Sequence, residues 1–231
     1  MVSEMDKKEL INKDIDSKKS REQIKIEPYN RILFIGDSIT DSSRDYGNSD
    51  DLGKGYAQLI AAYLLNKYPA YDLKFYNRGI NGNKVADLKE RWEEDCLELN
   101  PDVVSILVGV NDVWLRMCAL EEQTEATLAQ FEEDYRYLLK SLAQRSDARV
   151  VLMEPFVLPY PKDRNTWRTY LDPRIHIVRR IANDYHAALI PLDGLLNAKG
   201  IENGFQTYTG DDGVHPTLTG HALIADSWVK Q

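Results

Sequence analysis

The sequence has few cysteines, no long apolar run and no excess of positive charge, and each of these absences excludes a class of protein. Its two cysteines, Cys96 and Cys118, are too few for a disulfide framework, and we interpret both as reduced thiols. No apolar run approaches the roughly 20 residues that a helix needs to cross a bilayer. The formal net charge of -8 disfavours a nucleic acid or an anionic membrane as partner, because such partners usually require a basic surface.

The first residues also lack the features of a signal peptide. They contain no apolar h-region and no small-residue cleavage site, so we expect a cytoplasmic location. Residues 1–27 alternate acidic and basic side chains, and we interpret them as a charged tail or a loosely docked helix, with an oligomer contact as the alternative. Residues 28–231 are enough for one domain with a sizeable hydrophobic core. A homo-oligomer is expected from base rates alone.

Short apolar runs alternate with segments of helical period from residue 31 onward. The runs that predict strands are 32–35, 73–76, 103–108, 150–153 and 188–190. The helical patterns cover residues 56–64, 85–96, 128–142, 175–185 and 218–229. Because the strands are apolar without alternation, they suit a parallel sheet that is covered on both faces. We therefore predict an α/β protein with a doubly wound, flavodoxin-like sheet of five parallel strands and helices on both faces.

Polar and glycine-rich segments follow the first three predicted strands. They are Gly36–Thr40, Asn77–Asn83 and Gly109–Asp112, and a fourth motif, Asp212–Pro216, lies near the C-terminus. In a doubly wound sheet the ligand site lies beyond the carboxyl ends of the strands. Each motif is weak by itself, because glycine and asparagine are common in turns. Their occurrence in this order, three of them at strand ends, indicates one shared site.

Three of these residues suit acyl transfer, which needs a nucleophile, a base and a group that orients the base. Ser38 lies at a predicted strand-to-helix bend, where its hydroxyl can stand clear of the sheet. His215 precedes Pro216, which suits the first turn of the last helix. Asp212 lies three residues before His215 and is the expected partner of its ring. Asp211 is the competing carboxylate, and the three-residue spacing favours Asp212.

The tetrahedral intermediate of acyl transfer also needs hydrogen-bond donors for its negatively charged oxygen. We expect an oxyanion hole formed by the backbone N–H of Ser38, the backbone N–H of Gly79 and the side-chain amide of Asn111. Glycine at 79 permits close approach of the backbone to a substrate. An amide at 111 donates a hydrogen bond where an aspartate would not.

Other catalytic motifs are absent from the sequence. It contains no Gly-x-Ser-x-Gly, no phosphate-binding P-loop and no dinucleotide-binding glycine motif, and we expect no cofactor. The histidines lack metal-site spacing, so we expect no metal. We interpret His176, His186 and His221 as structural or surface residues on helices. Trp114 and Trp167 either line a substrate cleft or pack locally, and the sequence leaves both alternatives open.

Taken together, the four blocks resemble those of the SGNH hydrolases, also called GDSL esterases. That family is named for a Ser, a Gly, an Asn and a His, which Ser38, Gly79, Asn111 and His215 resemble, with Asp212 as partner of the histidine. The resemblance extends from about residue 31 to the C-terminus. It implies a serine esterase that forms an acyl-enzyme on Ser38.

Longer stretches are similar to one bacterial branch of that family. FIGDSITDSSR, NRGINGNKVADLKERWEEDC and PDVVSILVGVNDVW resemble a branch that includes non-secreted acetylxylan esterases. The resemblance implies removal of O-acetyl groups from carbohydrate, as in xylo-oligosaccharides. The alternatives are a lysophospholipase, a thioesterase or a general short-chain lipolytic esterase, and, in another class, a non-catalytic sugar-binding protein. Residues 155–172 are expected to flank the site, and their charged side chains favour a polar substrate.

Overall fold

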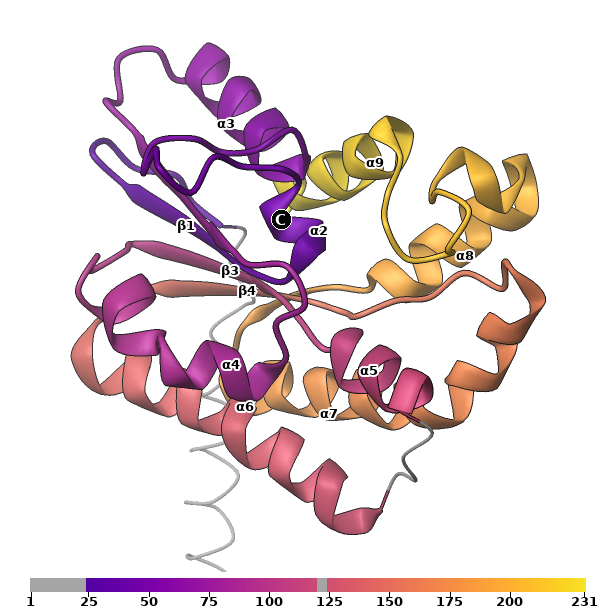
Figure 1. Cartoon of the computed structure of the whole chain (residues 1–231). Helices are drawn as coiled ribbons and strands as arrows, with labels where there is room; N and C mark the ends of the chain where they lie inside the picture. The colour runs from indigo at the N-terminus through magenta and orange to yellow at the C-terminus, as the bar shows by residue number, and fades with distance from the viewer. Residues whose placement is uncertain (1–23, 120–123) are drawn as a thin grey trace, which may run out of the picture.

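The computed structural model of the chain describes residues 24–119 and 124–231, which fold around one parallel sheet (Figure 1). The strands are β1 (Arg31–Gly36), β2 (Lys74–Gly79), β3 (Val103–Leu107), β4 (Arg149–Met153) and β5 (Ala188–Ile190). Their order in the sheet is β2-β1-β3-β4-β5, and every pair is parallel. This is the flavodoxin-like order, in which the chain reverses direction across the sheet between β1 and β3. The predicted α/β, doubly wound fold is confirmed.

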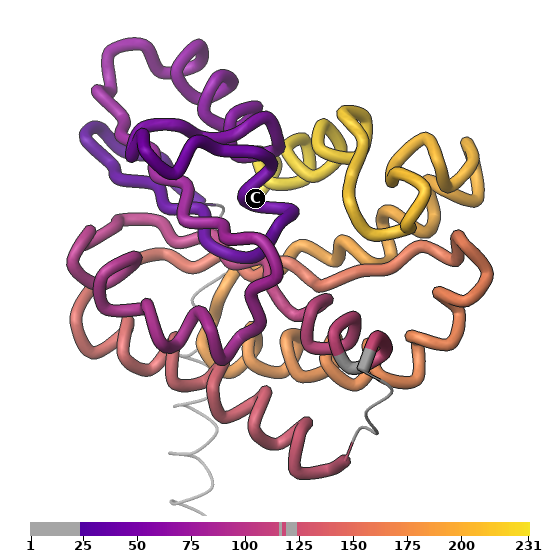
Figure 2. Tube along the Cα trace, viewed as in Figure 1, coloured from indigo at the N-terminus to yellow at the C-terminus, as the bar shows by residue number. Residues whose placement is uncertain are grey.

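Helices cover both faces of the sheet (Figures 1 and 2). One face carries α2 (Ser38–Asp41), α3 (Tyr56–Lys67), α8 (Leu192–Asn203) and α9 (Leu218–Val229). The other carries α4 (Val85–Glu90), the π-helix η1 (Glu93–Leu97), α6 (Glu125–Arg145) and α7 (Arg168–Asp184). The remaining elements are α5 (Asn111–Ala119) and the 3-10 helices η2 (Lys162–Trp167) and η3 (Phe205–Thr207).

The central strand β1 explains why its sequence is a continuous apolar run. Ile32 and Phe34 pack into the cluster under α3 and α9, whereas Leu33 and Ile35 pack into the cluster under α4 and α6. Successive side chains of a strand point to opposite faces, so a strand covered on both faces needs apolar residues at every position. Each such fully buried side chain stabilises the fold by about 1.5–3 kcal/mol.

The structure differs from the sequence-based elements in several places, and helix α7 begins at Arg168, seven residues before the predicted start. Strand β2 runs to Gly79, so Asn77–Gly79 belongs to the strand and does not follow it. The predicted helix over 85–96 is divided into α4 and the π-helix η1. Helices α5 and α8 have no counterpart among the predicted helices. The Asn111-Asp112 pair that predicts a turn begins α5, and Gly194 and Gly200 interrupt the apolar period of α8.

Most of the predicted N-terminal tail, residues 1–23, lies outside the described residues. The part that the structure describes, residues 24–27, contacts the domain. The Ile24 N–H donates to the backbone oxygen of Gln231 at 2.7 Å, and Ile24 and Ile26 pack against the hydrophobic core. The packed part of the chain therefore begins before residue 28.

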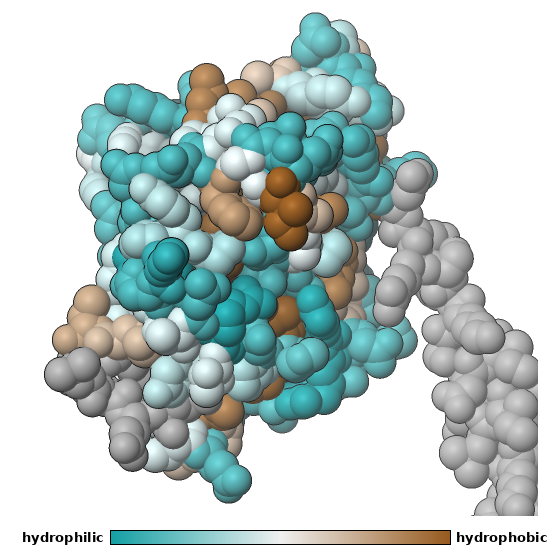
Figure 3. All heavy atoms as spheres, turned by 90° about the vertical axis from the view of Figure 1, so that its right-hand side faces the viewer, coloured by the Kyte–Doolittle hydropathy of each residue, from teal (hydrophilic) through white to brown (hydrophobic). Residues whose placement is uncertain are grey.

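The surface is mostly polar on the face shown in Figure 3, with small, separate hydrophobic areas. Scattered apolar side chains are normal on protein surfaces. Among residues 24–119 and 124–231, no helix is both long enough and apolar enough to cross a membrane.

Candidate active site

Ser38 is the first residue of α2, directly beyond the carboxyl end of β1. Asp37 is the N-cap of this helix, and its Oδ1 accepts a hydrogen bond from the Ile39 N–H at 3.0 Å. A Cβ on Gly36 would lie 2.0 Å from the backbone oxygen of Leu107, so glycine is required for the close approach of β1 to β3 at this bend. The backbone thus turns sharply from β1 into α2, and Ser38 lies at the carboxyl edge of the sheet.

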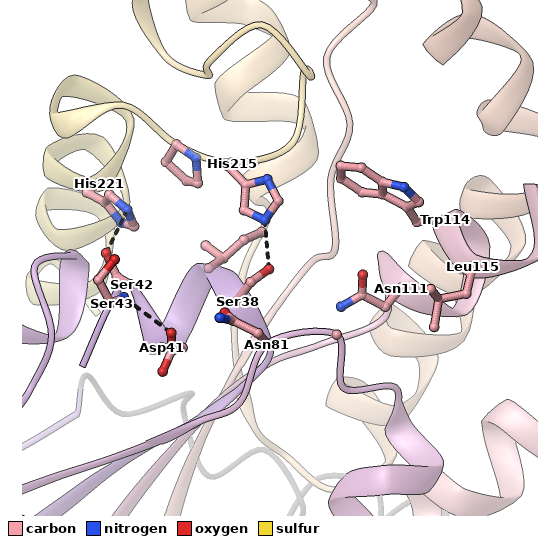
Figure 4. A pocket seen from close by; sticks show the side chains of 13 residues that line it. Ser38, Asp41, Ser42, Ser43, Asn81, Asn111, Trp114, Leu115, His215 and His221 are labelled. Atoms are coloured by element: carbon pink, nitrogen blue, oxygen red, sulfur yellow. Dashed lines mark hydrogen bonds between the residues drawn. The ribbon is translucent and has the colours of Figure 1, made fainter. Parts of the chain in front are cut away.

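The structure brings Ser38, His215 and Asp212 together, although 177 positions separate the serine from the histidine (Figure 4). Ser38 Oγ lies 2.8 Å from His215 Nε2, and Asp212 Oδ2 lies 2.6 Å from His215 Nδ1. The other carboxylate oxygen, Asp212 Oδ1, accepts the N–H groups of Val214 and His215, each at 2.9 Å. With a proton on Nδ1, the ring donates to Asp212 and accepts from Ser38, which is the arrangement that activates a serine.

The competing carboxylate, Asp211, has a different environment. It is exposed, and its Oδ1 accepts a hydrogen bond from Gln206 Nε2 at 3.2 Å. The three-residue spacing therefore selects the carboxylate that contacts His215.

Hydrogen bonds set the protonation of this pair. Burial acts to raise the pKa of Asp212, but the hydrogen bonds from the His215 ring and from two backbone N–H groups outweigh it and lower the pKa to about 2. The hydrogen bond to Asp212 raises the pKa of His215 above its ordinary value, against the opposing effect of burial. Near neutral pH the carboxylate is charged and His215 is a stronger base than a free histidine.

Gly79 does not occupy the place that the sequence-based prediction gave it. It lies within β2, its N–H donates to Asn77 Oδ1 at 2.8 Å, and it does not line the pocket that contains Ser38. A Cβ at this position would lie 2.1 Å from the backbone nitrogen of Asp41, so the glycine lets β2 pack closely on α2. Gly82, three residues later, lines the pocket at φ +80°, with open space where its Cβ would be. Both glycines follow the apolar run 73–76. Because β2 extends to Gly79, this glycine lies inside the strand, whereas Gly82 lies in the loop that reaches the pocket.

Asn111 begins α5 and lines the same pocket. Its Nδ2 donates one hydrogen bond to the backbone oxygen of Asn83 at 3.1 Å, which fixes the plane of the amide. The Asn83 side chain is held in turn by Arg91 Nε at 2.8 Å. Because an amide nitrogen carries two hydrogens, the second stays available for a ligand.

The pocket extends to both sides of the Ser38–His215 pair and has a volume of about 490 Å³. Asn111, Trp114 and Leu115 line one side, and Ser42, Ser43 and His221 line the other (Figure 4). His221 therefore belongs to the pocket, which the interpretation of it as an ordinary structural histidine did not foresee. Its helical spacing in α9 carried no signal of this position.

Trp114 and Trp167, for which the sequence allows either a place in a substrate cleft or local packing, have different positions. Trp114 lines the pocket, with its ring centroid 5.6 Å from that of His215. Trp167 is 3% exposed and packs against Trp114 at a centroid distance of 5.3 Å. The Arg164 guanidinium lies over both indole rings, and its Nε donates to the backbone oxygen of Asp212 at 2.7 Å. Residues 155–172 thus contact the loop that carries the catalytic candidates, and no sequence pattern pointed to Arg164.

Comparison with known sequences matches this chain to an acylhydrolase family and to two esterases. The model of the GDSL-like Lipase/Acylhydrolase family matches residues 34–223. The chain is similar to an acetylxylan esterase of Geobacillus stearothermophilus, with 32% identity over 90% of this chain and 96% of that protein. It is also similar to an acetylxylan esterase of Xylanibacter ruminicola, with 24% identity over 85% of this chain and 42% of that protein.

Solved structures agree with the sequence relatives. A protein of Parabacteroides merdae described as a GDSL-like lipase is 36% identical, with a TM-score of 0.83 over 90% of this chain and 97% of that one. Axe2, an acetylxylan esterase from Geobacillus stearothermophilus, is 30% identical, with a TM-score of 0.79 over 89% of this chain and 95% of that one.

The family model covers most of the chain, and a curated esterase of almost the same extent is 32% identical. The chain therefore belongs to the GDSL-like lipase/acylhydrolase family and is a carboxylic ester hydrolase.

Proposed function

We propose that this protein removes O-acetyl groups from carbohydrate, most directly from xylo-oligosaccharides, through an acyl-enzyme on Ser38. The observation that carries the proposal is the continuous chain of contacts from Ser38 Oγ through the His215 ring to Asp212, within an open pocket that both polar and apolar side chains line. Three Axe2 variants described as catalytic mutants replace a serine, a histidine and an aspartate by alanine. In Axe2 the aspartate precedes the histidine by three residues, which is the spacing of Asp212 and His215.

The first half of the reaction transfers the acetyl group to the enzyme. His215 Nε2 takes the proton of Ser38 as Oγ attacks the ester carbonyl carbon, and Asp212 stabilises the imidazolium that forms. The tetrahedral intermediate then collapses: the ester C–O bond breaks, and His215 returns the proton to the departing sugar oxygen. In the second half, His215 deprotonates a water that attacks the acetyl-serine, and acetate leaves as Ser38 recovers its proton.

The oxyanion hole of this reaction consists, in our proposal, of the N–H groups of Ser38 and Gly82 and the amide of Asn111. The Ser38 N–H is the first of α2 and has no acceptor within its helix. Gly82 and Asn111 line the pocket with Ser38. Gly82 thus replaces Gly79, whose N–H is already bonded to Asn77. Loss of one such donor costs about 2.7–4 kcal/mol of transition-state stabilisation.

The polar groups in the lining favour a sugar ester over a lipid. Hydroxyl, amide and imidazole groups of Ser42, Ser43, Asn81 and His221 line the pocket, whereas a long acyl chain needs an extended apolar groove. The alternatives are a lysophospholipase, a thioesterase or a general short-chain lipolytic esterase, which the same catalytic residues serve equally well. A non-catalytic sugar-binding protein is a further alternative, and it predicts no covalent labelling of Ser38 by an organophosphonate.

The deciding experiment compares acetate release from acetylated xylo-oligosaccharides with hydrolysis of p-nitrophenyl esters from acetyl to decanoyl. We expect the wild type to deacetylate the sugar and to prefer the acetyl ester, and Ser38→Ala to lose both activities. A preference for long acyl chains with no action on the sugar would contradict the carbohydrate substrate and favour a lipolytic esterase instead. Wild-type activity in Ser38→Ala would overturn the mechanism itself.

We also propose that the protein works in the cytoplasm on a neutral small molecule, with neither nucleic acid nor membrane as partner. Cys96, which is buried, and Cys118, which is exposed, are both free thiols, as suits a reducing compartment. The net charge of -8 is unsuited to polyanionic partners. Fractionation of the native cells tests the location, and enzyme found mainly in the medium would contradict it.

A further inference from the structure

The side of the pocket formed by Ser42, Ser43 and His221 has no part in the proposed mechanism. These residues lie beside the Ser38–His215 pair, on the side opposite Asn111, Trp114 and Leu115 (Figure 4). They come from two distant segments: the serines follow α2, and His221 lies in the first turn of α9. We call this set of three residues the hydroxyl side of the pocket.

The hydrogen bonds of His221 fix which nitrogen carries its proton. The backbone N–H of Tyr56 donates to His221 Nδ1 at 3.2 Å, so Nδ1 is an acceptor and the neutral ring carries its proton on Nε2. Burial lowers the pKa of His221 to about 4, so the ring is neutral near pH 7. The ring also stacks on Tyr56, with a centroid distance of 6.3 Å and an interplanar angle of 25°. His221 is therefore a rigid, neutral N–H donor.

The Nε2–H group of His221 makes only a weak hydrogen bond on the pocket side. The partner of Nε2 is Ser42 Oγ at 3.4 Å, which is longer than an ordinary N–H···O bond. A ligand oxygen that reaches both groups would make a better contact with each. Both side chains pack closely against Gly55, where an added Cβ would lie 2.7 Å from His221 Cε1 and from Ser42 Oγ.

The backbone of the two serines is unusual as well. Ser42 and Ser43 have φ of 43° and 61°, in the left-handed region that residues other than glycine seldom adopt. Backbone strain of this kind costs on the order of 1–3 kcal/mol per residue and persists where the surroundings hold it, often beside ligand sites. Ser42 is the C-cap of α2, and its N–H donates to the backbone oxygen of Ser38, so the end of the helix holds both serines at the rim of the pocket.

We propose that His221 and Ser42 form a subsite for a hydroxyl group on the alcohol part of the ester, with His221 Nε2–H as donor. An acetyl group has one hydrogen-bonding atom, its carbonyl oxygen, and the oxyanion donors take it. Further polar groups in the pocket are met only by the leaving alcohol, which must then carry hydroxyls beyond the esterified one. The subsite rests on the proposed function and assigns the sugar to this side of Ser38.

Two substitutions at position 221 separate ligand binding from a structural role. His221→Gln places an amide N–H near the position of Nε2 but removes the acceptor for Tyr56. His221→Asn places an amide oxygen near the position of Nδ1 but removes the donor that faces the pocket. The readout is the ratio of kcat/KM for an acetylated xylo-oligosaccharide to kcat/KM for p-nitrophenyl acetate, whose leaving group has no additional hydroxyl.

We expect His221→Asn to lower this ratio about threefold to tenfold, as loss of one hydrogen bond predicts, mainly through a higher KM for the sugar. We expect His221→Gln to retain more of the ratio than His221→Asn does. The matched control is His176→Asn, because His176 is an exposed histidine of α7 and does not line the pocket. Thermal denaturation of each variant shows whether it is folded.

The opposite pattern would refute the subsite. If His221→Asn retains the wild-type ratio, or if both substrates lose activity equally in both variants, His221 only supports Tyr56. Failure of the proposed function is visible in the wild type alone, as hydrolysis of p-nitrophenyl acetate without deacetylation of the sugar, and the subsite for a sugar falls with it.

Discussion

The negative charge of Asp212 controls the basicity of His215. The carboxylate contacts the ring at 2.6 Å and is held by two backbone N–H groups, so it is both charged and fixed in orientation. We expect Asp212→Asn, which keeps the shape and removes the charge, to lower kcat about 10³- to 10⁴-fold, as an asparagine at the equivalent place of a serine protease triad does. Steady-state hydrolysis of p-nitrophenyl acetate measures the loss.

The neighbouring carboxylate provides the control. Asp211→Asn removes the same charge one residue away, where the side chain is exposed and contacts Gln206. We expect kcat within about twofold of the wild type, because an exposed charge beyond direct contact is screened by solvent. Equal losses in the two variants would show that Asp212 does not act through its contact with His215.

The pH dependence follows from the direction of the His215 shift. His215 must be neutral to accept the proton of Ser38, and its hydrogen bond to Asp212 favours the protonated ring and so raises its pKa. We expect kcat/KM to rise with pH along a limb whose midpoint lies above about 6.5, the ordinary histidine value. In Asp212→Asn the midpoint should move to lower pH. A rate that is independent of pH from 5 to 8 would count against His215 as the base.

At the scale of elements, β2 packs closely on α2, the short helix that begins with Ser38. Gly79 lies against the backbone of Asp41, where a Cβ would come within 2.1 Å of a nitrogen atom that cannot move aside. We expect Gly79→Ala to lower the free energy of unfolding by about 1–3 kcal/mol, as overpacking does. The melting temperature should fall by about 2–4 °C for each kcal/mol.

A glycine in α8 gives the matched comparison. Gly194 lies in the first turn of the helix and has no atom within 4 Å of the place of its Cβ. We expect Gly194→Ala to raise the free energy of unfolding by about 0.5–1 kcal/mol, because alanine favours a helix. Calorimetry measures the melting temperature of both variants. An unchanged melting temperature in Gly79→Ala would mean that α2 can shift to accommodate the added methyl group without loss of stability.

The elements that the sequence predicted are those with a strong apolar signal. Each predicted strand is present, and the signal is strongest for the central strands β1 and β3, which are buried on both faces. Helix α5 escaped prediction because it begins with Asn111-Asp112, a pair that is typical of turns. Helix α8 escaped because its glycines weaken its apolar period. Element ends were least predictable, and the three additional residues of β2 placed Gly79 inside the strand.

At the scale of the whole molecule, the net charge of -8 bears on the choice of substrate. A neutral sugar ester approaches a negative protein without penalty, whereas an anionic ester is repelled, and salt screens the repulsion. We expect kcat/KM for p-nitrophenyl acetate to vary less than about twofold between low and high salt. With p-nitrophenyl succinate, whose free carboxylate adds a negative charge, we expect kcat/KM to increase with salt. Equal responses of the two esters would show that the field at the pocket is not negative.

Sequence pattern alone was enough to predict the strands of the sheet and to name Ser38, Asp212 and His215 as catalytic candidates. The signals for the strands and for the Asp212–His215 pair are local: an apolar run favours a strand, and Asp212 lies only three positions before His215 in the sequence. The contact of Ser38 with His215 depends on tertiary structure, and so do the presence of Gly82 rather than Gly79 in the pocket, the contact of Arg164 with the Asp212 loop and the contact of His221 with Ser42. Each of these depends on contacts between segments far apart in the chain, or on where a strand ends in space. Local sequence pattern does not encode such contacts, because they arise only when the packed core fixes the separate elements against one another.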